Sequence, residues 1–120
     1  MSTITLTPTE KTIHRHLLAS ATQAIPTLAE ALSAASIIRK EATPHYSLLY
    51  LEPKLLSPSL PRVPLEVRFF GPWGAPIQCL LHVLDGTLHM IEIFCADSAP
   101  LPEAITLQAT QIIDYTKEIQ

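Results

Sequence analysis

Residues 77–95 read IQCLLHVLDGTLHMIEIFC, the stretch of this sequence that decides the fold. Two apolar runs rich in β-branched residues flank Asp85-Gly86, a dipeptide typical of the tight turn between two antiparallel strands. The pattern predicts a strand over 77–84 and a second strand over 87–95. Both faces of this hairpin carry apolar side chains, so we expect another layer of the protein, or another chain, on each face.

Two helices are predicted near the N-terminus. Thr7, Pro8 and Glu10 fit the N-cap, the first helical position and the carboxylate of a capping box. A helix over residues 8–22 follows, with a narrow apolar face at a 3.6-residue period. Pro26 opens a second, shorter helix over residues 26–35 with a similar apolar face, so the two helices form a helical hairpin.

Three further segments have the composition of strands, and one has the composition of a loop. SIIRKEA (36–42) and YSLLYLE (46–52) predict an antiparallel pair, and LEVRFF (65–70) predicts a strand before the hairpin. Residues 53–64 hold four prolines and no glycine, so we expect a stiff, extended loop there. Three of its prolines recur every three residues, which leaves recognition by an aromatic-lined groove open as an alternative.

The C-terminal segment, residues 102–120, fits two patterns. Ile105, Ala109 and Ile112 lie on one face of a helix, whereas the content of Ile and Thr favours a strand. We expect a weak terminal helix. The fold predicted for residues 1–120 is a single α+β domain, in which two N-terminal helices pack on one face of a four-stranded antiparallel meander, one strand fewer than the five segments of strand composition.

Length and composition exclude several classes of protein. With 120 residues and 48% hydrophobic content, the chain can bury one core without disulfides or a metal. No segment resembles a signal peptide or a membrane span, so we expect a cytoplasmic protein. In the predicted register Cys79 and Cys95 point to opposite sides of the hairpin, so we expect two reduced thiols rather than a disulfide.

Charge is spread unevenly along the chain. The formal net charge is −3, but residues 1–60 carry five Lys/Arg against four Glu, whereas residues 61–120 carry three Lys/Arg against seven Asp/Glu. An acidic half disfavours nucleic acid, because binding to phosphates requires clustered basic side chains. It suits a basic protein partner better.

Two histidines of the hairpin are candidates for a ligand site. A two-residue turn would place His82 directly opposite His89, with Cβ atoms roughly 5 Å apart, which is close enough for both rings to reach one ion. Zinc requires three or four ligands, and the same face offers no further carboxylate or thiol. We therefore expect no metal and no cofactor. A metal or small molecule held by the two histidines is the alternative.

The sequence contains no local catalytic motif. The glycines are Gly71, Gly74 and Gly86, and none of them opens a helix, so a phosphate-binding loop is excluded. There is no GxSxG elbow, no CxxC and no HExxH motif. Cys79 and His82, three residues apart on a strand, point to opposite faces and cannot form a nucleophile pair. We expect a protein that is not an enzyme.

The segment LLHVLDGTLHMIEIF and the following Ala99-Pro100-Leu101-Pro102, preceded by two short helices, resemble part of a known family. Its members are small uncharacterised bacterial proteins that end in a hairpin of the form LLxVDGGxLxxLEVY and a proline-containing tail. The chain departs from that pattern at EATPHY, between its first two strands. The resemblance implies no catalytic residues. In size, acidity and lack of a local active site, the chain is also similar in type to bacterial immunity proteins.

These observations predict a small protein that binds another protein. In its sharpest form it is an immunity protein or inhibitor that neutralises a basic toxin by surface complementarity. Its partner-binding residues would be Trp73, Glu66, Asp85, Glu92 and Asp97, with Trp73 either a lid on the core or an anchor of the interface. A homodimer through a spare sheet face is a further hypothesis. Neither nucleic acid nor a membrane is expected as a partner.

Overall fold

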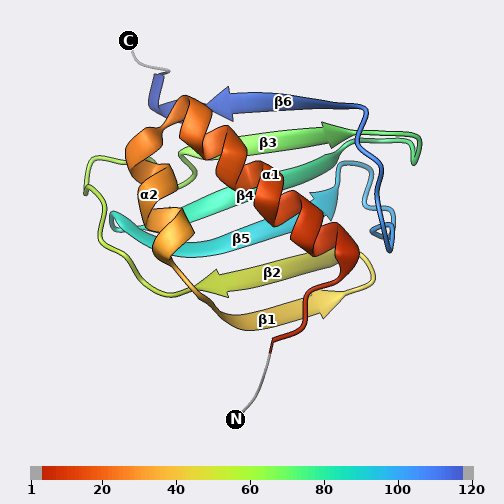
Figure 1. The fold of residues 1–120 in the computed structure, drawn as a ribbon, viewed down its shortest axis with the longest axis horizontal. Coiled ribbons are helices and arrows are strands. Elements are labelled where there is room, and N and C mark those ends of the chain that lie inside the picture. Colours follow the sequence, from red (N-terminus) through yellow and green to blue (C-terminus); the bar gives the residue numbers. More distant parts are fainter. Residues whose placement is uncertain (1–3, 118–120) are drawn as a thin grey trace.

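The computed structural model describes residues 4–117, which form six strands and two α-helices in two layers. Helix α1 (Pro8–Ala24) and helix α2 (Pro26–Ala34) lie on the same face of the sheet (Figure 1). Among the described residues, no helix has both the length and the apolarity needed to span a bilayer. The strands are β1 (Ile37–Thr43), β2 (Tyr46–Leu51), β3 (Leu65–Phe70), β4 (Ile77–Leu84), β5 (Thr87–Cys95) and β6 (Ala109–Asp114), followed by a 3-10 helix over Tyr115–Lys117.

All strand pairs are antiparallel, and the order across the sheet is β1-β2-β5-β4-β3-β6. The prediction of an α+β fold with two helices and an antiparallel sheet is confirmed, but the predicted four-stranded meander is wrong. Strand β2 pairs with β5 and not with β3, because the proline-rich loop carries the chain past the tip of the β4–β5 hairpin. Leu56 N donates to Gly86 O at 2.7 Å and Leu88 N donates to Lys54 O at 2.9 Å, which fastens the loop there.

The helix expected near the C-terminus is also wrong. Residues Ala109–Asp114 form strand β6, which pairs with β3 from Ala109 opposite Phe70 to Asp114 opposite Leu65. The isoleucines and threonine of this segment favour extended backbone, and the free edge of β3 supplies the hydrogen-bond partners that a strand requires. Residues 118–120 of the expected helix lie outside the described residues. The two edge strands of the sheet are therefore β1 and β6.

The start of α1 follows the sequence prediction closely. Thr7 Oγ1 accepts a hydrogen bond from Glu10 N at 3.1 Å, and Thr7 N donates to Glu10 Oε1 at 2.9 Å, which is the reciprocal pair of a capping box. The helix stops before Pro26, since a residue that precedes proline is disfavoured in helical geometry. Ile25 accordingly has φ −140° and ψ 81°, and α2 starts afresh at the proline.

The core lies between the two helices and the facing side of the sheet. Every second residue of β3, β4 and most of β5 points to this side and is buried. Each large aliphatic side chain buried here contributes about 1.5–3 kcal/mol to folding. The buried apolar residues include Ile13, Leu17, Leu28, Leu32, Leu49, Leu65, Val67, Phe69, Ile77, Leu81, Leu88, Ile91 and Ile93.

A β-bulge in the β4–β5 hairpin changes the predicted register. The first two pairs after the turn are those of a two-residue loop, but His82 then pairs with Met90, which leaves His89 as the additional residue. The shift of one residue places Cys79 and Cys95 on the same, helix-facing side of the sheet, where both are buried. The prediction that the cysteines point to opposite sides is thus wrong, although both are free thiols as expected.

Candidate functional site on the open face of the sheet

One face of the sheet is not covered by a helix of the described chain (Figure 1). The proline-rich loop and the 3-10 helix reach this face at its β3–β4 side, where a hollow is lined by Pro61, Val63, Glu66, Leu80 and Tyr115. We call this surface the open face; its side chains alternate along the strands with those of the core. Its apolar and aromatic side chains are Tyr46, Leu48, Tyr50, Phe70, Leu80, Leu84, Met90, Phe94 and Ile113.

A row of alternating carboxylates and leucines crosses the open face. Glu41 of β1 lies beside Leu48 of β2, and Leu48 lies beside Glu92 of β5. Glu92 lies beside Leu80 of β4, which in turn lies beside Glu66 of β3. Neighbouring strands are about 4.8 Å apart, so successive carboxylates of this row are about 10 Å apart across the sheet. Sequence reasoning found Glu66 and Glu92 but not the row, because the row depends on four strand pairings.

Glu66 is the most buried member of the carboxylate row, at 4% exposed. Its Oε2 accepts hydrogen bonds from Arg68 Nε at 2.8 Å and Gln78 Nε2 at 2.9 Å, and its Oε1 accepts one from Tyr115 Oη at 2.7 Å. Burial raises the pKa of this carboxyl, but the three donors and the charge of Arg68 outweigh burial and hold the pKa below its ordinary value. Glu66 is therefore ionised and joins β3, β4 and the 3-10 helix.

Glu92 lies at the centre of the carboxylate row and has a histidine as its partner. His82 Nε2 is 2.8 Å from Glu92 Oε1, and the two side chains are 13% and 33% exposed. The other members of the row each pair with an arginine: Glu41 with Arg39 at 3.2 Å, and Glu66 as described above. Glu92 is thus paired with a histidine, whereas the other two carboxylates of the row are paired with arginines.

His89, the additional residue of the bulge, does not face the other hairpin histidine across the ladder, so the predicted direct pair is wrong. Its ring packs edge-on against Tyr50, with 5.8 Å between centroids. Burial, and then the charges of Arg62, His82 and Arg39, lower the pKa of His89. Within residues 4–117 no group of three or more His, Cys, Asp or Glu side chains is arranged to hold a metal ion.

Three of the five predicted partner-binding residues lie in turns at the ends of the strands. Trp73 is in the β3–β4 turn, where its ring packs against the core and over Gly71, so that a Cβ on this glycine would meet the ring at 2.1 Å. This is the position of a lid on the core. Asp85 forms the hairpin tip with φ 51°, and Asp97 follows β5 at the other end of the sheet. The structure thus brings two of the five residues together on the open face.

A second buried carboxylate lies on the helix side of the sheet, at the start of α1. Glu10 is 2% exposed and accepts hydrogen bonds from Lys40 Nζ at 2.7 Å and from Ser47 Oγ. Burial raises the pKa of this carboxyl, but the hydrogen bonds from Lys40, Ser47 and Thr7 outweigh burial and hold the pKa below its ordinary value. The cluster ties α1 to β1 and β2, and the Ser47 hydroxyl is held as a donor rather than activated as a nucleophile.

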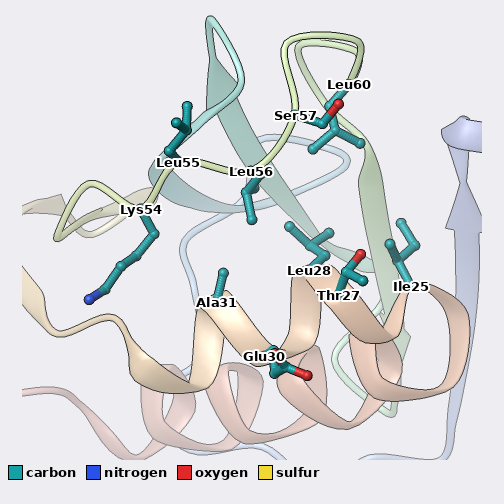
Figure 2. Close-up of a pocket in the computed structure, with 10 residues that line it drawn as sticks. All are labelled: Ile25, Thr27, Leu28, Glu30, Ala31, Lys54, Leu55, Leu56, Ser57 and Leu60. Atoms are coloured by element: carbon teal, nitrogen blue, oxygen red, sulfur yellow. The ribbon is translucent and has the colours of Figure 1, made fainter.

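A groove of about 560 Å³ separates α2 from the proline-rich loop on the helix side of the sheet. Figure 2 shows Leu56 pointing from the loop toward Leu28 and Ala31 of α2, whereas Leu55 points away from them. Leu55 is 79% exposed. The lining is mostly aliphatic, with Lys54 at the loop side, so the groove offers shape more than charge for recognition.

Comparison with models of protein families, with curated proteins and with solved structures found no match to this chain. The resemblance to a family of small bacterial proteins therefore stays a prediction, as does the similarity in type to immunity proteins. Fold and site together define an α+β domain with two helices on one face of an antiparallel sheet and an open face on the other.

Proposed function

We propose that this protein binds another protein through the open face of its sheet. The observation that carries the proposal is the one-sided packing: both helices cover the same face, and the opposite face presents aromatic and aliphatic side chains around the carboxylate row. Tyr46 and Leu84 on this face are 40% and 46% exposed. An apolar surface with polar groups set among aromatic residues is typical of protein interfaces.

The partner that fits this face best has an apolar patch with a basic side chain near its centre. Leu48 and Leu80 flank Glu92 on both sides in the carboxylate row. An incoming Lys or Arg would pair with Glu92 while its aliphatic stem lies on the two leucines. The excess of acidic residues in 61–120 also favours a basic partner. An inhibitor of a basic toxin is the sharper form of this proposal.

Binding is better supported than catalysis by the state of the buried carboxylates. Glu10 and Glu66 are both surrounded by donors that lower their pKa values. A general acid at neutral pH requires a raised pKa, so neither group is tuned for proton transfer. Both carboxylates instead connect elements of the fold.

The experiment measures affinity with variants of the open face and a matched variant elsewhere. A tagged protein captures its partner from the native cell at low salt, and isothermal titration calorimetry then gives the Kd of the purified pair. Leu84→Ser and Tyr46→Ala should each weaken binding by about tenfold, since each removes an exposed apolar contact from the interface. Gln23→Ala removes an exposed side chain from α1, in the helix layer, and should leave the Kd unchanged.

Glu92→Gln tests the charge at the centre of the row. This variant should weaken binding and reduce the dependence of the Kd on salt, because the pair with a basic side chain is lost. Wild-type affinity in all three open-face variants would contradict the proposal. An equal loss in Gln23→Ala and the open-face variants would contradict it as well.

The alternative function, a metal or small molecule held by His82 and His89, has a weaker basis because the bulge removes the direct pairing of the two histidines. It predicts that Zn²⁺ raises the Tm of the wild-type protein but not that of His82→Ala. An unchanged Tm of the wild type at saturating Zn²⁺ would eliminate the metal form of this alternative.

A further inference from the structure

We propose that the outer edge of β6 pairs with β6 of a second copy of this chain, in antiparallel orientation, to form a weak dimer with one continuous sheet. This contact uses the sheet edge and is independent of the open face. The two edge strands of the sheet, β1 and β6, differ in charge and in regularity.

Strand β1 has features that keep an edge from pairing. Its centre carries the charged side chains Arg39, Lys40 and Glu41. Its register with β2 shifts between Ile37 and Arg39, which makes the strand irregular. Charged side chains and irregularities of this kind block the addition of another strand. We therefore regard β1 as a protected edge.

Strand β6 lacks these features. It reads ATQIID, is uncharged from Ala109 to Ile113, contains no proline and pairs with β3 without a register shift. Its first three residues are exposed. A regular, uncharged edge strand that contains β-branched residues is a template for another strand. The sheet thus has one protected edge and one open edge.

The backbone of β6 determines the register of the proposed dimer. Along a strand, the backbone N–H and C=O groups of successive residues point alternately to one neighbouring strand and to the other. Tyr115 N donates to Pro64 O at 3.0 Å, so the odd-numbered residues of this segment are bonded toward β3. The outward amides are therefore those of Thr110, Ile112 and Asp114. Two copies pair about a two-fold axis at Ile112, with Thr110 of each copy opposite Asp114 of the other.

The charge pattern of β6 suits a second copy. In this register the two Asp114 carboxylates lie at opposite ends of the strand pair, about 13 Å apart along the strands, which exceeds a Debye length at physiological salt. Self-pairing therefore brings no like charges together. One strand pair buries less than the ~1,200 Å² of a standard stable interface, so we expect a Kd of about 10–100 µM.

Sedimentation velocity over a concentration series tests the dimer. The wild type should change from monomer to dimer as its concentration rises through the Kd. Thr110→Lys places a lysine at an exposed position of the open edge and should raise the Kd by about tenfold or more. Thr43→Lys adds the same charge at an exposed position of the protected edge and should leave the Kd unchanged.

Amide hydrogen exchange tests the register without any substitution. The amides of Thr110 and Ile112 should exchange more slowly as the concentration of the wild type rises, whereas those of β1 should not change. A wild type that stays monomeric up to about 1 mM overturns the proposal. So does a dimer that is equally weakened by Thr110→Lys and Thr43→Lys. A dimer that persists in Thr110→Lys and is lost in Leu84→Lys also overturns it, and assigns self-association to the open face.

Discussion

Replacing Lys40 by methionine should destabilise the fold by about 3 kcal/mol at pH 7. Lys40 Nζ lies 2.7 Å from Glu10 Oε1, and the side chains are 20% and 3% exposed. Methionine keeps the apolar stem but leaves a buried carboxylate without a cationic partner. Loss of one partner from a buried ion pair costs about 3–5 kcal/mol. We expect the lower end because Ser47 and Thr7 still donate to Glu10.

The cost of Lys40→Met should fall on acidification. Because the pKa of Glu10 is lowered in the folded protein, its stabilising contribution is present above the unfolded pKa, near 4.5, and is lost as the pH falls through the folded pKa. Once Glu10 is protonated, Lys40 has no charge to neutralise. The difference in unfolding free energy between wild type and Lys40→Met should therefore shrink below about pH 4.

A double-mutant cycle with Glu10→Gln isolates the pair. Urea unfolding of the wild type, both single variants and the double variant, followed by circular dichroism at pH 7, should give a coupling free energy of about 1–3 kcal/mol. The same cycle at about pH 3.5 should give a smaller value. Additive effects of Lys40→Met and Glu10→Gln at pH 7, or an equal coupling at both pH values, would refute the reasoning that a buried ion pair ties α1 to β1.

Three other outcomes test the packing. Gly86→Ala should lower the unfolding free energy by more than about 1 kcal/mol in thermal melts, because Gly86 has φ +77° and a Cβ would lie 2.7 Å from Ser57 O in the proline-rich loop. Burial raises the pKa of the Cys79 thiol, so a thiol reagent at pH 8 should label it in urea-unfolded protein and not in native protein; rapid native labelling would contradict its position in the core. Phe69→Ala should cost about 3–5 kcal/mol in urea unfolding, and a cost below about 1 kcal/mol would contradict the assigned core.

Local patterns were sufficient to predict both helices and most of the strands. LEVRFF and the two arms of the hairpin have the predicted bounds, and each helix differs from its prediction by one or two residues at its C-terminal end. These elements depend on short-range chemistry: alternation along a strand, the Asp85-Gly86 turn, and proline at the first position of each helix. Nothing distant in the sequence is needed to specify them.

Strand order and the C-terminal strand could not be predicted in this way. Ile112 fits a helix face and a strand equally well, and the outcome depends on the free edge of β3, more than 40 residues earlier in the sequence. The bulge at His89 has no local marker either, because no residue in TLHM is specific for an additional position. A shift of one residue then changed the cross-strand partners of Cys79 and His82.

The candidate site was predicted in part. Glu66 and Glu92 were identified from the excess of acidic residues in the second half of the chain, and both lie on the open face. Glu41 was not identified, because it joins the other two only through β2 and β5. Glu10 was recognised as a capping residue, but its pair with Lys40 requires α1 to lie over the edge of the sheet.

The strand that replaced the expected C-terminal helix accounts for both proposed contacts. A helix over residues 102–120 would have been available to cover the open face, and Leu80 and Phe94 would then belong to a second core. Because residues 109–114 instead extend the sheet beside β3, they add no helix over the apolar face, and a regular, uncharged strand becomes the outer edge. The same backbone pairing therefore leaves a surface for a partner protein and creates an edge for a second copy.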